Sequence, residues 1–140
     1  MNLPLRIAAV AAWMALIFFF SSQTGGESAG LSTRVVDLLA PAFPALDPAA
    51  LGTLVRKAAH VSEFAVLGAL LTWAWPREAR WPLLAPLLIG IGYATSDEVH
   101  QLFVPGRAGQ VSDVLIDAVG VLIGIALVAG VRRRRDRDEG

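Results

Sequence analysis

Polar and ionisable side chains gather around one short loop between two apolar stretches of the sequence. The loop contains Pro105, Gly106 and Arg107, and the polar residues on either side of it are Asp97, Glu98, Gln101, Asp113 and Asp117. Ionisable groups at the ends of membrane-length stretches are energetically costly and are usually kept for a function. Paired carboxylates in such a setting can hold a divalent cation, share one proton, or act as acid and base.

A second polar group lies on one face of an earlier helical stretch. Its members recur at steps of four, three and four residues, and they are Arg56, His60, Glu63 and Leu67. Residues at these steps share a helix face, and Lys57 also lies within reach of His60. His60 and Glu63 can form a metal pair, or a base and the group that orients it. A plain surface pair at the membrane interface is an equally good interpretation.

The carboxylates also have a purely structural interpretation. Asp97 and Glu98 can pair with Arg56, Lys57 or Arg107 and so lock the helix ends together. The carboxylates outnumber these basic partners, and uncompensated negative charge in a low-dielectric setting is costly. We therefore favour a function over a structural network of ion pairs.

Individual positions carry more specific expectations. Asp117 lies about one turn deeper than Asp113 and requires a partner, for which His60 and Arg56 are the candidates. Arg107, after the Pro-Gly break, can meet a phosphate or a carboxylate. It can equally serve as a brace between the loop and a helix.

Two further residues are expected to support the carboxylates. Gln101 and Tyr93 are placed to hold them through hydrogen bonds and not to react. Serine nucleophiles are not expected, because an activated serine needs an adjacent base. The sequence offers no clear base for Ser21, Ser22 or Ser112.

The composition excludes several classes of protein. The chain has 140 residues, 55% of them hydrophobic, and a mean hydropathy of +0.57. These values exclude a disordered protein and argue against an ordinary soluble domain. There is no cysteine, and therefore no disulfide, thiol nucleophile or thiolate metal site. The arginine run at residues 132–135 follows an apolar stretch, so it is expected to anchor the topology and not to bind nucleic acid.

Four apolar stretches approach the roughly 20 residues that span a bilayer core. They cover about residues 3–20, 58–75, 81–101 and 111–131, and little chain remains for anything else. We expect an all-α, multi-pass membrane protein, with one domain over residues 1–140 and a cytoplasmic tail at 132–140. The first stretch also fits a cleaved signal peptide, but the small-residue cleavage pattern after it is poor.

The longest polar connection, residues 21–58, is expected to contain a short helix at the membrane interface. Residues 25–28 are typical of a flexible loop, and Leu31, Val35 and Leu38 then follow at helical spacing. Asp47 and Pro48 together are a strong helix start signal. The second membrane helix should therefore begin near Pro48, well before the membrane.

Basic residues in short loops mark the cytoplasmic side of a membrane protein. With both termini cytoplasmic, eight of the twelve basic residues lie inside, including the arginine run. This topology brings the polar residues of the second, third and fourth apolar stretches to the outer leaflet. Three basic residues there face five carboxylates, and this excess favours a bound divalent cation or a protonated His60.

Small residues in the last apolar stretch predict a close helix contact. Gly120 and Gly124 form a small-xxx-small pattern on the face that also carries Asp113 and Asp117. The neighbour is either another helix of the same chain or a second copy, so a homo-oligomer is one possibility.

The motifs resemble those of the VanZ-like family of small membrane proteins. The resemblance covers most of the chain and is carried by residues 20–23, 56–64, 96–107 and 112–117, together with Gly120. Its most specific part is the run Ser96-Asp-Glu-Val-His-Gln-Leu-Phe-Val-Pro-Gly-Arg107. The resemblance implies a four-helix integral membrane protein. It also implies a relation to low-level resistance to the glycopeptide teicoplanin, to which the family's named member is linked.

Three functional hypotheses follow. In the first, an outer-leaflet site binds or acts on an anionic envelope molecule, such as a lipid-linked phosphate or a cell-wall precursor. The candidate catalytic residues are His60, Glu63, Asp97, Glu98 and Asp117, and the candidate ligand-binding residues are Arg56, Lys57, Gln101, Arg107 and Asp113. In the second, the protein is a non-catalytic envelope protein or recruits a partner. A cation pathway ranks last, because few polar residues lie deeper than Asp117.

Overall fold

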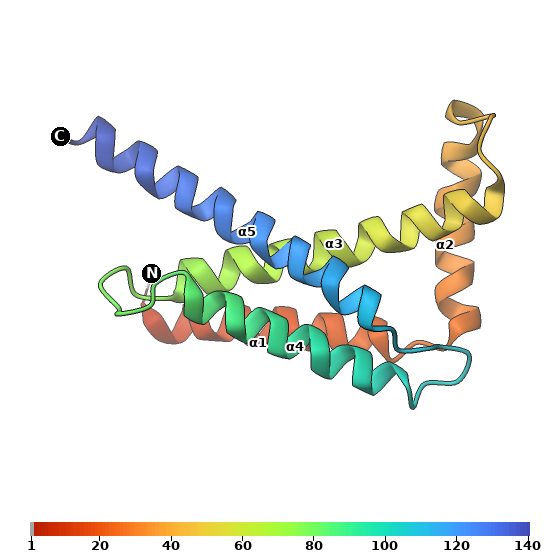
Figure 1. Cartoon of the computed structure of the whole chain (residues 1–140), viewed down its shortest axis with the longest axis horizontal. Coiled ribbons are helices and arrows are strands. Elements are labelled where there is room, and N and C mark those ends of the chain that lie inside the picture. The colour runs from red at the N-terminus through yellow and green to blue at the C-terminus, as the bar shows by residue number, and fades with distance from the viewer. Residues whose placement is uncertain (1) are drawn as a thin grey trace.

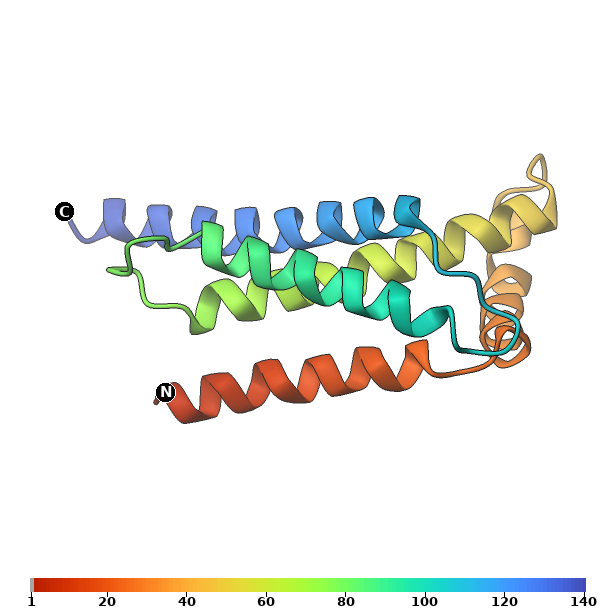
Figure 2. The same cartoon turned by 60° about the horizontal axis from the view of Figure 1, so that its bottom comes forward.

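The computed structural model describes residues 2–140, and every regular element within that range is helical (Figure 1). The elements are α1 (Leu3–Ser21), α2 (Gly25–Leu39), the 3₁₀ turn η1 (Ala40–Ala42), α3 (Pro48–Ala74), α4 (Leu84–Gln101) and α5 (Val111–Asp138). The all-α fold predicted from the sequence is therefore confirmed. The four long helices run along one another, and α2 crosses one end of them (Figures 1 and 2). Helix α3 packs against all four other helices.

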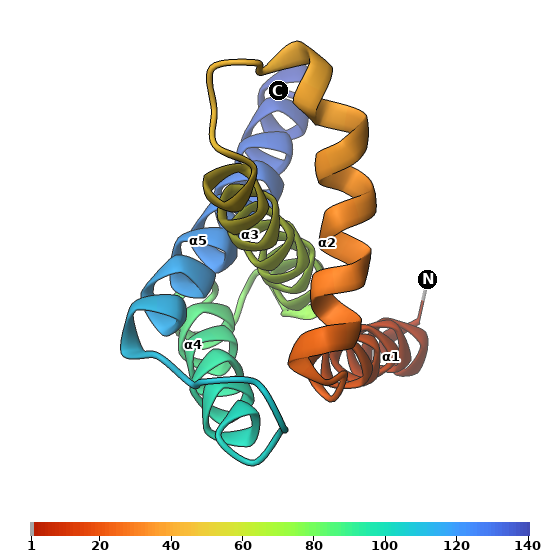
Figure 3. The same ribbon diagram turned by 90° about the vertical axis from the view of Figure 1, so that its right-hand side faces the viewer.

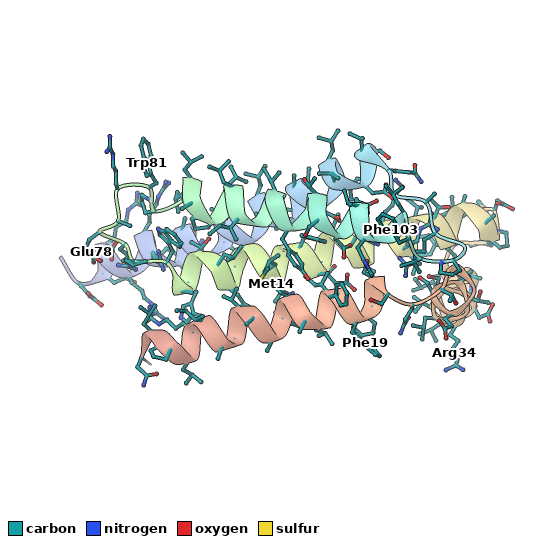
Figure 4. All side chains as sticks on the ribbon, turned by 90° about the horizontal axis from the view of Figure 1, so that it is seen from below. Met14, Phe19, Arg34, Glu78, Trp81 and Phe103 are labelled. Atoms are coloured by element: carbon teal, nitrogen blue, oxygen red, sulfur yellow. The ribbon has the colours of Figure 1, made fainter. Side chains whose placement is uncertain are left out.

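The two ends of the bundle differ in what they carry. The start of α1, the end of α5 and the α3–α4 turn lie at one end, while α2 and the α4–α5 loop lie at the other (Figure 2). At the first end, Arg132 donates from Nη2 to the carbonyl of Thr72 at 2.7 Å, and Arg6 donates to that of Trp73 at 3.3 Å. Cations are favourable at these C-terminal carbonyls of α3. Figure 4 shows Glu78 and Trp81 at this end and Arg34 at the α2 end.

Glycines set the contact between α3 and α5. A Cβ at Gly120 would lie 2.5 Å from the Val61 carbonyl oxygen, and one at Gly124 would overlap the Ala65 carbonyl. The predicted close approach is therefore confirmed, and its partner is α3 of the same chain. Both glycines are buried, so this face of α5 is not free for a second copy. In this structure Gly120 and Gly124 therefore serve the contact between α3 and α5.

Apolar side chains cover the outside of the bundle as well as its centre. The buried core is small and consists of Ile17, Phe64, Leu67, Leu71, Ala94, Val121 and Ile125. Large apolar residues on other faces are exposed, for example Phe19 at 61% and Leu115 at 65% (Figure 4). Two helices, α1 and α5, are long and apolar enough to cross a membrane. Helices α3 and α4 carry the polar residues named above and do not meet the same criterion.

Helix α3 begins where the sequence predicted its start. The Asp47 carboxylate accepts hydrogen bonds from the backbone N–H groups of Ala49 and Ala50, each at 3.1 Å, and α3 begins at Pro48. At 27 residues the helix is about 40 Å long, so its first turns extend past the other helices and carry α2.

Two segments differ from the sequence-based expectation. Residues 25–28 are not a flexible loop, because Thr24 and Glu27 form a capping box and α2 begins at Gly25. Gly25 is needed for packing, since a Cβ there would overlap the Gly106 carbonyl, and its N–H donates to Pro105 at 3.0 Å. Helix α5 also continues beyond residue 131 through the arginine run to Asp138.

Candidate functional site

Figure 3 looks onto the α2 end of the bundle, where α3, α4 and α5 lie beside one another. Each of these three helices contributes one polar residue to a cluster at this end. His60 comes from α3, Glu98 from α4 and Asp117 from α5, and one ligand atom of each lies within 4.8 Å of the others. The close packing of α3 on α5 places the first and third side by side. The sequence-based topology had placed these groups in one leaflet, and the fold brings them into contact distance.

His60 and Asp117 form a direct pair. His60 Nδ1 lies 3.3 Å from Asp117 Oδ1, and the two side chains are 17% and 0% exposed. Asp117 therefore has one of its two predicted partners. The contact has the distance of an ion pair without the alignment of a hydrogen bond, so within residues 2–140 both Asp117 oxygens lack a hydrogen-bond donor.

In Asp97 and in Glu98, one carboxylate oxygen accepts a hydrogen bond and the other does not. Glu98 Oε2 accepts from the backbone N–H of Gln110 at 2.8 Å, and Asp97 Oδ2 accepts from Gln101 Nε2 at 3.0 Å. The other oxygen of each carboxylate is buried without a hydrogen-bond donor in the described part of the chain. Both residues are only 4% exposed. Buried carboxylate oxygens of this kind are costly, and a bound cation or a proton can compensate them.

The ion pair with a basic residue that forms beside the cluster is one that the sequence analysis did not name. Lys57 Nζ lies 3.4 Å from Asp113 Oδ1, so these two predicted ligand-binding residues neutralise each other. Neither Arg56 nor Arg107 lies within 4.0 Å of a carboxylate in residues 2–140. The structural alternative, in which arginines lock the carboxylates, is therefore not realised for Asp97 and Glu98.

Arg107 braces the α4–α5 loop against a helix, which was the second of the two roles expected from the sequence. Its Nε and Nη2 atoms donate to the carbonyls of Gln23 and Phe20, each at 3.1 Å, and its Nη1 atom lies 3.5 Å from Gln101 Oε1. These bonds fasten the α4–α5 loop to the end of α1. Burial lowers the pKa of the Arg107 guanidinium, but arginine stays protonated in proteins.

Two contacts considered from the sequence do not form within residues 2–140. No ion pair joins Glu63 to His60, which pairs with Asp117 instead, and Glu63 is not among the three clustered ligand residues. The Tyr93 hydroxyl donates to the Met14 carbonyl at 2.6 Å and so joins α4 to α1 instead of holding a carboxylate. The expected role of Gln101, by contrast, is confirmed by its bond to Asp97.

Two hollows lie beside this cluster, under α2. The larger hollow, about 520 Å³, lies between α2, the first turns of α3 and the α4–α5 loop. The smaller hollow, about 210 Å³, is lined by Glu63 and Asp97 and by apolar residues of α1, α2 and α3, namely Phe20, Leu31, Val35 and Val55. The side chains of Arg56, His60 and Arg107 line both hollows. Cationic, titratable and apolar groups thus meet in one place.

One polar contact was missed by sequence reasoning. Ser22 Oγ lies 3.1 Å from His100 Nε2, although the sequence showed no base near Ser22 and no role for His100. The two residues are 78 positions apart, so no local pattern links them. The Ser22 hydroxyl donates to the Phe18 carbonyl at 2.6 Å, so its proton is not directed at His100. This geometry is not that of an activated nucleophile.

Comparison with known proteins identifies one family. The family model described as VanZ/LLP1 matches residues 6–132. No curated protein and no solved structure matches the chain.

Proposed function

Because the chain belongs to the VanZ/LLP1 family, with a match over residues 6–132, we propose that it is a membrane protein that binds an anionic envelope molecule under α2. The preferred ligand is a lipid-linked phosphate, or a cell-wall precursor carried on one. The relation to teicoplanin resistance belongs to the same proposal, since an altered envelope precursor is what a glycopeptide would sense. The proposal covers the position of the protein in the membrane, the anionic group of the ligand and the apolar chain of the ligand.

The membrane part of the proposal is a four-span protein of the bacterial cytoplasmic membrane with both termini cytoplasmic. Exposed apolar side chains support it, because they occur on all four long helices, as at Phe19, Val66, Leu88 and Leu115. Water would disfavour such a surface, whereas lipid accepts it. Helix α2 exposes Leu31, Val35 and Leu38 on one face, which suits a helix lying at the outer interface.

The anion part rests on one observation above all. Arg56 and Arg107 line the same two hollows as His60, and neither lies within 4.0 Å of a carboxylate in the described structure. Arg56 makes no side-chain hydrogen bond there either, so its guanidinium is available to a ligand. Guanidinium groups bind phosphate oxygens through charge-assisted, often bidentate hydrogen bonds.

The apolar part concerns the smaller hollow. Its wall contains Phe20, Leu31 and Val35 beside Arg56 and Arg107. A molecule with a phosphate at one end and a hydrocarbon chain at the other satisfies both kinds of wall. A small free anion would leave the apolar wall uncovered, and this favours an amphiphile.

The cluster beside the hollows supplies the groups for any chemical step. His60 lines both hollows and lies 3.3 Å from Asp117, so a histidine–carboxylate pair, which can take part in acid–base chemistry or hold a metal ion, borders the space proposed for the ligand. Glu63 and Asp97 line the smaller hollow and remain proposed members of the site. Lys57 and Asp113 neutralise each other at the edge of the larger hollow, so we expect them to contribute less to binding.

Substitution Arg56→Gln tests the proposal. Arg56 is exposed and makes no bond that holds the fold, so the variant should unfold like the wild type. Binding of a polyprenyl phosphate to the full chain in nanodiscs is expected to weaken by at least about tenfold, because one charge-assisted contact is worth roughly 1.5–3 kcal/mol. Binding can be followed by native mass spectrometry or by intrinsic tryptophan fluorescence.

The matched control is Arg34→Gln. Arg34 is an exposed arginine of α2 at the same end of the bundle, and it lines neither hollow (Figure 4). This variant should bind the phosphate like the wild type, and the corresponding polyprenyl alcohol should bind more weakly than the phosphate. Equal affinity of Arg56→Gln and the wild type, or of alcohol and phosphate, would contradict an arginine-based anion site.

A further inference from the structure

Three polar side chains at the α2 end lie close together but do not satisfy one another's hydrogen-bonding groups. One ligand atom each from His60, Glu98 and Asp117 lies within 4.8 Å of the other two, and each residue belongs to a different helix. A chance surface cluster of acidic residues would be exposed to solvent, but Asp117 and Glu98 are 0% and 4% exposed.

The same three residues also carry buried polar atoms that make no hydrogen bond. Both oxygens of Asp117, Oε1 of Glu98 and Nδ1 of His60 have no hydrogen-bond partner among residues 2–140. No lysine or arginine in that range lies within 4.0 Å of Glu98 or Asp117. Two buried carboxylates with free oxygens and one imidazole therefore form a group that a metal ion can neutralise and bridge, whereas a proton can satisfy only one oxygen at a time.

We propose that His60, Glu98 and Asp117 bind a divalent transition-metal ion, for which Zn²⁺ is the best match. Carboxylate oxygen and imidazole nitrogen are both ordinary ligands of Zn²⁺, whereas an imidazole ligand argues against Mg²⁺ and Ca²⁺. Three protein ligands also leave one position of a tetrahedral ion open, as in catalytic zinc sites.

The surroundings of the three residues suit this assignment. The backbone N–H of Gln110 donates to Glu98 Oε2, which fixes the carboxylate and leaves Oε1 free for the ion. Partners of this kind orient metal ligands in known sites. Neighbouring Asp97 is held by Gln101 and stands outside the group of three.

The metal ion would take part in the anion binding proposed above, and this role of the ion rests on that proposed function. His60 lines both hollows, so the open coordination position would be reached from the space in which Arg56 and Arg107 bind the anion. A phosphate oxygen of the ligand is the group that would take this position. Metal binding itself does not depend on that ligand.

The test is metal binding by the full chain in detergent, after removal of bound metal with a chelator. We expect one Zn²⁺ per chain by calorimetry and by elemental mass spectrometry. Asp117→Asn and Glu98→Gln should each weaken Zn²⁺ binding by at least about 100-fold, since each removes a direct ligand and outer partners alone are worth 10–100-fold. Zn²⁺ should raise the Tm of the wild type and leave that of both variants unchanged.

The matched control is Asp113→Asn, which removes a carboxylate on the same helix that pairs with Lys57 instead. It should bind Zn²⁺ like the wild type. If Asp117→Asn fails to fold, Glu98→Gln and His60→Ala carry the same test, because His60 is the most exposed of the three side chains.

Three results would overturn the inference. They are no stoichiometric Zn²⁺ on the wild type, unchanged Zn²⁺ affinity in the ligand variants, and tighter binding of Mg²⁺ or Ca²⁺ than of Zn²⁺. Binding of polyprenyl phosphate, measured on the same samples, separates this failure from that of the proposed function. Phosphate binding without Zn²⁺ binding removes only the metal, and Zn²⁺ binding without phosphate binding removes only the proposed ligand.

Discussion

Gly124→Ala is expected to lower the free energy of unfolding by about 3 kcal/mol, the upper end of the usual cost of overpacking. The added methyl group would overlap the Ala65 carbonyl and lie 2.6 Å from the Ala69 amide nitrogen. Both neighbours are backbone atoms of α3, which cannot turn aside as a side chain can. Helices α3 and α5 must therefore separate, and His60 and Asp117 with them. Unfolding in detergent, followed by circular dichroism against denaturant or temperature, measures the loss.

Gly130→Ala is the control for this prediction. Gly130 lies in the same helix, but no atom lies within 4 Å of a Cβ built there. Alanine should be neutral or slightly stabilising at that position, because it is the better helix former by roughly 1 kcal/mol. Equal stability of the two variants would mean that α3 and α5 do not pack as closely as described.

Arg107→Ala is expected to destabilise the protein by roughly 2–4 kcal/mol, because hydrogen bonds from a charged group are worth about 1.5–3 kcal/mol each. The variant loses the bonds to the Phe20 and Gln23 carbonyls, which fasten the α4–α5 loop to α1. Arg107→Lys should recover only part of the loss, since an ammonium group cannot reach two carbonyls as a planar fork can. Thermal unfolding and amide exchange in residues 101–110 report the effect.

The comparison with Arg56 separates the two arginine roles. Arg56→Gln should weaken phosphate binding while leaving stability unchanged, whereas Arg107→Ala should lower both. Stability equal to wild type after Arg107→Ala, together with unchanged exchange in the loop, would show that the brace contributes nothing.

Helix boundaries were predictable where the signal is local. Asp47 is a preferred N-cap residue and Pro48 is preferred at the first helical position, and α3 begins there. Gly25 shows the opposite case. A side chain at Gly25 would overlap the Gly106 carbonyl, which is about 80 residues away in sequence. The glycine is therefore needed for a distant contact, and its local pattern was misread as flexibility. The Thr24–Glu27 capping box was present in the sequence and would have given the start of α2.

The contents of the site were predictable, but its pairings were only partly so. Topology alone placed His60 and Asp117 at the same end, and their contact at 3.3 Å fulfils one of two options. Glu63 was one candidate partner of His60 because it lies three residues away, yet the packing of α5 on α3 places Asp117 at 3.3 Å from His60. Spacing on one helix cannot report a contact that depends on which second helix is adjacent.

Tyr93 illustrates a directional error. It lies four residues before Asp97, so a shared face suggested a hydrogen bond between the two. Side chains on a helix lean toward its N-terminus, which carries the Tyr93 hydroxyl away from Asp97 and toward the Met14 carbonyl on α1. The residue therefore joins two helices and does not reach the carboxylates.

Photocrosslinking with a polyprenyl phosphate that carries a photoreactive group next to its phosphate tests the anion site under α2. Crosslinks in membranes should map to peptides lining the smaller hollow, around residues 20–35 and 55–63, and Arg56→Gln should remove them. The matching alcohol should not label these peptides. Crosslinks spread over the outward faces of α1 and α5, alike for phosphate and alcohol, would contradict an anion site under α2.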